Sequence, residues 1–122
     1  MKIAIPVDDK SLNTSVCQSF GRTPYYLIYD TESKESVFLD NSAVASQGGA
    51  GIKAAQTIVD NKIGALLTPR CGENAAQVLK AAHIKLYKTV NSSVQDNIEA
   101  IKDGKLSPLE DIHPGFHGHG EK

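Results

Sequence analysis

Several features that mark common classes of protein are missing from this sequence of 122 residues. It has no tryptophan, 6% aromatic residues, two cysteines and a formal net charge of −1. Two cysteines do not make the disulfide framework of a small secreted domain, and the first residues turn polar too soon for a secretory signal. A chain without a basic stripe lacks the footprint of general nucleic-acid binding. Because no stretch approaches the ~18 apolar residues of a membrane helix, we expect a cytoplasmic protein that binds neither membrane nor nucleic acid.

The apolar residues that are present predict one α/β domain. A chain of this length can bury one hydrophobic core and is too short for two. Alternating or continuous apolar residues predict five strands, and apolar residues at helical spacing predict three helices. The predicted strands are residues 3–7, 25–29, 36–39, 63–67 and 84–87, and the predicted helices are residues 52–61, 75–82 and 94–103.

The order of these elements, β-β-β-α-β-α-β-α, predicts a mixed five-stranded sheet. A leading antiparallel hairpin followed by βαβ units places helices on the faces of such a sheet. Ser92, with Gln95 three residues later, resembles a capping box for the last helix, and Gly104 would end that helix. We therefore expect a domain over residues 1–104 and an extension over 105–122, of which 105–110 form at most a short docking segment.

The two cysteines, Cys17 and Cys71, lie in loops that we expect at one edge of the sheet. If residues 3–7 run parallel to residues 63–67, both loops leave the carboxyl ends of these strands, where α/β proteins bind ligands. Cys71 precedes a helix, whose dipole would lower the pKa of the thiol; Arg70 would act in the same direction and Glu73 against it. Reactive thiols, metal ligands and inert core residues remain alternatives for both cysteines.

Glycines mark the start of the first helix, at residues 48–51. Bare N–H groups at a helix start bind anions, and an anionic metal–sulfur cluster would use thiolates and N–H groups together. Gly49-x-Gly51-x-x-Ala54 also satisfies a loose dinucleotide fingerprint, but it follows an antiparallel hairpin, and no Walker A motif is present. A third interpretation is that the glycines allow close packing of the helix on the sheet.

The extension ends in a Gly/His-rich segment that we expect to be flexible. His113, His117 and His119 are interleaved with glycine, and neutral imidazoles suit a divalent metal ion. Incidental histidines in a solvated terminus are the alternative. Carboxylates after the first and third predicted strands are too few for the two-metal site of a nuclease, so we do not expect hydrolysis.

Five blocks of the sequence form a recognisable set: residues 1–7, 20–26, 48–55, 71–75 and 79–82. Together they resemble the dinitrogenase iron–molybdenum cofactor biosynthesis family. The resemblance implies a ribonuclease-H-like three-layer fold. It also implies a small non-catalytic carrier or chaperone for an iron–sulfur or molybdenum/iron–sulfur cluster or its precursor. Such a carrier would have a cluster donor and an acceptor protein as partners.

The resemblance also suggests where the cluster would bind. In the family a histidine often precedes the Phe-Gly motif; here Ser19 takes that position, and Cys17 lies two residues earlier. The expected cluster-binding residues are Cys17, Ser19, Phe20, Gly21, Arg22, Gly48, Gly49, Ala50, Gly51, Arg70, Cys71 and Gly72. The expected metal ligands are Cys17, Cys71, His113, His117 and His119.

Two other classes of function remain open on sequence alone. One is a regulatory module that binds a small anion or a nucleotide through residues 48–51 and Arg70, with the cysteines inert. The other is an enzyme, either a thiol-redox catalyst or a degenerate nuclease. The sequence leaves the bound cluster, the partners and formation of a homo-oligomer undetermined.

Overall fold

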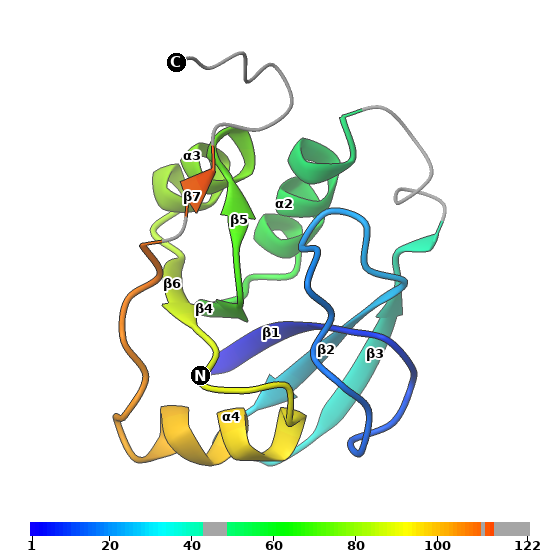
Figure 1. The fold of residues 1–122 in the computed structure, drawn as a ribbon, viewed down its shortest axis with the longest axis vertical. Helices are drawn as coiled ribbons and strands as arrows, with labels where there is room; N and C mark the ends of the chain where they lie inside the picture. The colour runs from blue at the N-terminus through cyan, green and yellow to red at the C-terminus, as the bar shows by residue number, and fades with distance from the viewer. Residues whose placement is uncertain (43–48, 111, 114–122) are drawn as a thin grey trace.

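The structure, a computed structural model, contains the predicted five-stranded mixed sheet (Figure 1). It describes residues 1–42, 49–110, 112 and 113. In the sheet order β3-β2-β1-β4-β6, β1 pairs antiparallel with β2 and parallel with β4. The antiparallel pairing of β2 with β3 and the parallel pairing of β4 with β6 complete the sheet and confirm the leading hairpin. Its strands are β1 (Lys2–Val7), β2 (Tyr25–Asp30), β3 (Ser36–Asp40), β4 (Ala65–Thr68) and β6 (Lys85–Lys88).

Helices cover both faces of this sheet and make the predicted three layers. Helices α2 (Ala50–Asp60) and α3 (Glu73–Ala81) pack against each other on one face, and α4 (Val94–Lys102) covers the other (Figure 1). Successive residues of a strand point to opposite faces, so β1 contributes Ala4 to the layer of α2 and α3 and Ile5 to the layer of α4. A strand that is buried on both faces therefore reads as continuously apolar.

A second, two-stranded sheet corrects the prediction that Cys71 lies in a loop. Strand β5 (Cys71–Gly72) pairs in parallel with β7 (Ile112–His113). The residues between α4 and β7 also pack on the domain, because Leu106 and Leu109 are both buried. Two-residue strands have no hydrophobic period, and their pairing joins segments about forty residues apart. Neither feature can be found by reading the sequence locally.

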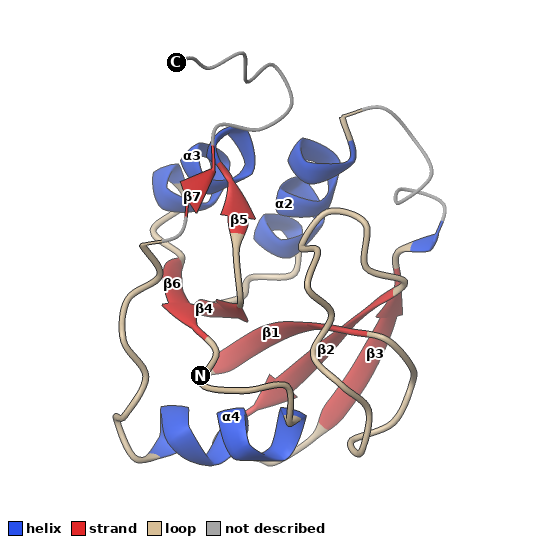
Figure 2. Cartoon of the chain, in the orientation of Figure 1, coloured by secondary structure: helices blue, strands red, loops and turns tan. Residues whose placement is uncertain are grey.

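The N-cap of α4 lies one residue beyond the predicted one. Ser93, not Ser92, occupies the N-cap, and its hydroxyl oxygen accepts a hydrogen bond from the N–H of Asp96 at 3.1 Å. Ser92 instead uses its carbonyl to accept the N–H of Val16, in the long connection between β1 and β2. This connection runs beside α2 (Figure 2) and forms one wall of the site described next.

Candidate functional site

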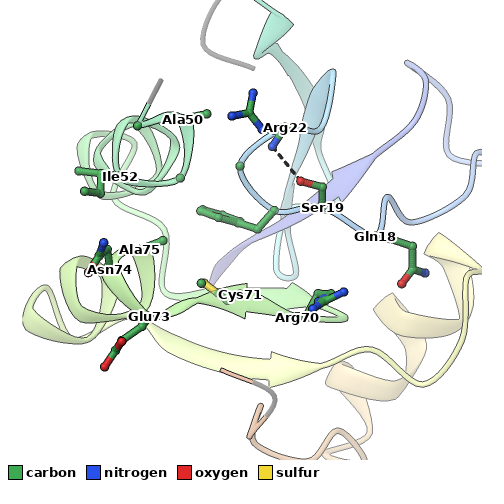
Figure 3. A pocket seen from close by; sticks show the side chains of 15 residues that line it. Gln18, Ser19, Arg22, Ala50, Ile52, Arg70, Cys71, Glu73, Asn74 and Ala75 are labelled. Atoms are coloured by element: carbon green, nitrogen blue, oxygen red, sulfur yellow. Dashed lines mark hydrogen bonds between the residues drawn. The ribbon is translucent and has the colours of Figure 1, made fainter. Parts of the chain in front are cut away.

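A pocket of about 570 Å³ lies where the starts of α2 and α3 meet the connection between β1 and β2 (Figure 3). The parallel pairing of β1 with β4 brings these segments to one edge of the sheet, as the sequence predicted. Ten of the lining residues are ones that the sequence analysis selected. They are Ser19, Phe20, Gly21, Arg22, Gly49, Ala50, Gly51, Arg70, Cys71 and Gly72.

Two helix N-termini without a side-chain cap converge on this pocket. The N-cap residues are Gly49 for α2 and Gly72 for α3, and in the described part of the chain neither helix start has a side-chain cap hydrogen bond. The first N–H groups of a helix have no carbonyl partner within the helix, and the helix dipole makes this end electropositive. The pocket therefore presents backbone donors suited to an anion from two directions.

The glycines of the pocket have different structural roles. Gly49 is in the left-handed conformation, with φ 72°, and a Cβ atom there would meet none of the described residues within 4 Å. A Cβ on Gly51 would lie 3.7 Å from the Cβ of Ala75, an ordinary contact. The interpretation that these two glycines permit close helix-on-sheet packing is therefore wrong. The close approach is at Gly21, where a Cβ would lie 2.8 Å from the Cα of Gly51.

Charged side chains around the pocket favour an anion. Arg22 and Arg70 both line it, whereas Glu73 is the one acidic residue among the described lining residues. Figure 3 shows the Glu73 carboxylate directed away from Ser19 and Arg22. The N–H of Arg22 donates to the hydroxyl oxygen of Ser19 at 3.0 Å, which closes the turn that carries the arginine. The pocket lining thus includes two arginines, a residue type whose guanidinium group suits an anionic ligand.

Cys71 lies in the pocket wall, but its thiol is not activated. Its side chain is 1% exposed, and burial raises the pKa of the thiol to about 11, although Lys80 acts in the opposite direction. The prediction that the start of α3 and Arg70 would lower this pKa is wrong. Desolvation of a thiolate outweighs the helix dipole at so buried a position.

Cys17 is half-buried and does not line the pocket, although the next residue, Gln18, does. Its N–H donates to the carbonyl of Pro6 at 2.8 Å, which ties the loop to the end of β1. Both cysteines lie close enough to Tyr26 for their charges to raise the pKa of its phenol, after the larger effect of burial. The fold thus brings the two thiols into the neighbourhood of one side chain.

The predicted metal ligands of the tail are placed only in part. His113 lies in β7, where its backbone pairs with Gly72 of the pocket, and His117, His119 and Gly48 lie outside the described residues. In the described part of the chain, no group of three or more His, Cys, Asp or Glu side chains is arranged to hold a metal ion.

Five lining residues were absent from the predicted site. Four lie in blocks that carried the family resemblance: three follow Gly72 directly and one follows Gly51, so extending the site along those blocks would have found them. The fifth, which precedes Ser19, lies outside the blocks and gave no separate signal. The five are Gln18, Ile52, Glu73, Asn74 and Ala75.

Fold and pocket together define a class: small three-layer α/β domains with a ligand pocket at two helix N-termini. The family model described as "Dinitrogenase iron-molybdenum cofactor" matches residues 1–104. The chain therefore belongs to the dinitrogenase iron–molybdenum cofactor family.

Individual relatives agree with this assignment. The apo form of the orange protein from Desulfovibrio gigas superposes with a TM-score of 0.84 at 29% identity, over 90% of this chain and 93% of that one. A NifB-like protein of Thermotoga, TM1290, gives a TM-score of 0.80 at 34% identity, over 94% and 98% of the two chains. The uncharacterized protein MJ0580 of Methanocaldococcus jannaschii is 29% identical over 113 residues, 90% of this chain and 92% of its own.

Family membership and these neighbours indicate a role in binding or building a cofactor. Within the described residues, none of the helices has the length and apolar character that a membrane span needs.

Proposed function

We propose that this protein is a small, non-catalytic carrier that binds an anionic metal–sulfur cluster, or a precursor of one, and delivers it to an acceptor protein. One observation carries the proposal: two uncapped helix N-termini and two arginines line a single pocket in a member of an iron–molybdenum cofactor family. Clusters of iron or molybdenum with sulfide carry negative charge, which N–H groups and guanidinium groups stabilise.

Anion recognition, rather than a complete set of metal ligands, is the main source of affinity in this proposal. Cluster iron normally takes thiolate ligands, and the chain has two cysteines, of which Cys71 starts as a buried neutral thiol. A metal can displace the proton of a coordinating thiol, so coordination by Cys71 would release a proton and strengthen as the pH rises.

Incomplete ligation suits transfer of the cargo. A cluster that a full set of thiolates encloses is difficult to hand over, whereas one held by N–H groups and arginines can pass to an acceptor with more ligands. We propose that a donor protein supplies the cluster in the cytoplasm and that Cys17, close to the pocket loop, assists during loading or release. His113, His117 and His119 would bind a divalent metal transiently.

The same N–H and guanidinium donors would also bind a phosphate. A small-anion or nucleotide-binding regulatory module is therefore the competing function. The fold makes a dinucleotide site the weaker of these possibilities. Helix α2 follows the antiparallel strand β3 at the sheet edge, whereas the dinucleotide fingerprint follows a parallel strand within a βαβ unit.

Anaerobic purification tests the proposed function. The wild-type protein should carry iron or molybdenum together with acid-labile sulfide and should absorb visible light. Arg70→Gln should lose most of this cargo, and the matched variant Arg70→Lys, which keeps the positive charge, should retain more. A wild-type protein that carries no metal and binds phosphate instead would favour the regulatory module.

The double variant Cys17→Ser/Cys71→Ser separates thiolate ligation from anion recognition. If the thiols coordinate the cluster, this variant loses it while remaining folded. Retention of the cluster by the double variant would show that N–H groups and arginines suffice.

A further inference from the structure

Most of the buried polar side chains in the described residues hold the walls of the pocket. Apart from tyrosines, the described residues include four buried polar side chains: Thr23, Asn41, Thr68 and Asn97. Thr68 donates to the carbonyl of Arg70 at 3.0 Å and so fixes the strand end next to Cys71. Of these four, only Asn97 acts elsewhere, at the start of α4.

The connection between β1 and β2 receives the densest set of these hydrogen bonds. The Asn41 side chain donates from Nδ2 to the carbonyls of Gly21 at 3.1 Å and Thr23 at 2.9 Å. The Thr23 hydroxyl donates to the carbonyl of Val7 at 2.8 Å. A buried polar side chain is unfavourable unless it is hydrogen-bonded, so these residues stabilise one conformation of the loop.

Tyr26 reaches the pocket wall itself. Its side chain is fully buried, and its hydroxyl donates to the carbonyl of Phe20. The rings of Tyr26 and Phe20 also pack together, with centroids 5.4 Å apart and planes inclined at 52°. A single residue of strand β2 therefore contacts both the backbone and the side chain of Phe20.

The loop that Tyr26 holds lies directly against the start of α2. A Cβ atom on Gly21 would lie 2.8 Å from the Cα and 2.9 Å from the N of Gly51, so the two backbones are in contact. Displacement of residues 20 and 21 would change the width of the pocket between Arg22 and the first turn of α2.

We propose that Tyr26 is a positioning residue of the pocket: its hydroxyl, through the Phe20 carbonyl, fixes the Phe20–Gly21 wall at the distance from α2 that ligand binding requires. The role in ligand binding rests on the proposed function; the role in holding the loop does not. Burial, and next the charges of Cys71 and Cys17, raise the pKa of Tyr26, so the hydroxyl remains a donor over the pH range in which cells and assays operate.

The test compares Tyr26→Phe with the matched variant Tyr29→Phe. Tyr29 is a buried tyrosine of the same strand that packs in the layer of α4, away from the pocket. Two quantities are measured: exchange of the Arg22 amide, which reports closure of the turn onto Ser19, and calorimetric affinity for tetrathiomolybdate, the simplest soluble anion with molybdenum–sulfur bonds.

Tyr26→Phe should speed exchange of the Arg22 amide about tenfold, the factor expected when a hydrogen bond is lost and a buried carbonyl is left unpaired. The exchange rates of the β1 amides should rise no more in Tyr26→Phe than they do in Tyr29→Phe. Affinity for tetrathiomolybdate should fall about threefold or more in Tyr26→Phe and remain unchanged in Tyr29→Phe.

Equal acceleration at Arg22 and in β1 would show that Tyr26 merely stabilises the fold and would overturn the proposal. Faster exchange at Arg22 with unchanged affinity would overturn the role in ligand binding. If wild-type protein does not bind the probe, the proposed function fails for this anion, and the ratio of exchange rates still decides whether Tyr26 holds the loop.

Discussion

At the scale of single residues, the pocket combines a thiol that burial keeps protonated with glycines of unequal importance. Cys71 is covered by the domain, so its chemistry depends on desolvation more than on the helix that follows it. Gly21 and Gly51 touch through their backbones, yet only Gly21 has no room for a side chain. Both features lead to measurable predictions.

The buried thiol of Cys71 should make stability fall with pH above 9. Its pKa is about 11 in the folded protein and 9.0 in an unperturbed thiol, so folding favours the neutral form. This contribution is fully present below pH 9 and is lost as the pH rises from 9 through 11. Between pH 8 and pH 10, the free energy of unfolding should decrease by about 1 kcal/mol more with Cys71 present than in Cys71→Ala.

Urea denaturation under reducing conditions measures this difference, with Cys17→Ala in both proteins so that one thiol remains to be compared. Tyr26 is present in both proteins, so its contribution to the pH dependence of stability cancels in the comparison. An equal loss of stability with and without Cys71 would contradict the assignment of a buried, protonated thiol.

The two touching glycines should respond oppositely to alanine. Gly21→Ala forces a methyl group into the backbone of Gly51 and should destabilise the protein by about 1–3 kcal/mol, the usual range for overpacking. Gly51→Ala meets only an ordinary contact with Ala75, and the better helix propensity of alanine should leave stability equal or up to about 1 kcal/mol higher. Denaturation midpoints of the two variants check this; equal destabilisation would refute the assigned contact.

Because Gly49 has positive φ, a valine there would strain the backbone whether or not the site binds a ligand. A Gly49 variant therefore cannot separate binding from folding. Gly51→Ala separates binding from folding, because its methyl group makes only an ordinary contact with Ala75, another residue of the pocket lining.

At the scale of elements, the sequence predicted most of what has a period and missed what depends on contacts between distant segments. The hairpin of β2 and β3 follows from aromatic and β-branched runs around a polar turn, and the three helices follow from their apolar stripes. The β5–β7 pair joins Cys71 to Ile112 and has no local signal. The raised pKa of Cys71 was missed for the same reason, because burial is a property of the assembled layers.

The sequence located the pocket but not the side chains that hold its walls. The motifs around Phe20, Gly49 and Cys71 located the pocket, since parallel strands place their following loops at one edge of the sheet. The anchors of the pocket, Asn41 and Tyr26, gave no motif, because each acts through a backbone carbonyl that carries no sequence signal.

The cap of α4 offers a test at this scale. Ser93→Ala removes the acceptor for the Asp96 N–H and should lower the free energy of unfolding by about 1 kcal/mol. Ser92→Ala is the matched control, because this serine contributes its carbonyl rather than its hydroxyl, and its effect should stay within about 0.5 kcal/mol. A larger loss of stability for Ser92→Ala than for Ser93→Ala would contradict Ser93 as the N-cap and favour Ser92, the residue that the sequence alone suggested.

At the scale of the whole molecule, the C-terminal segment that carries His113, His117 and His119 begins within the fold. Strand β7 pairs with β5, whose residues line the pocket, and Ile112 packs against the core layer of α2 and α3. Residues 112 and 113 are thus part of the fold, so removing them together with the tail would confuse two effects.

Two truncations separate these effects. Deleting residues 114–122 should leave the melting temperature nearly unchanged, because a Gly/His segment offers little apolar area for burial, and should weaken Zn²⁺ or Ni²⁺ binding in a titration. Deleting residues 112–122 should also lower the melting temperature, since it removes the β5–β7 pair and the packing of Ile112. Equal metal affinity with and without residues 114–122 would show that these histidines have no metal-binding role.

The proposed function requires that the pocket at the starts of α2 and α3 binds an anionic metal–sulfur cargo through helix N-termini. The most direct measurement is an NMR titration of the ¹⁵N-labelled, metal-free protein with tetrathiomolybdate, with sulfate as a control of equal charge. Tetrathiomolybdate should bind saturably at one equivalent, with the largest shifts at the amides of Gly51, Glu73 and Asn74 in the first turns of the two helices, and sulfate should bind more weakly. Absence of binding, or shifts confined to residues away from the pocket, would contradict it.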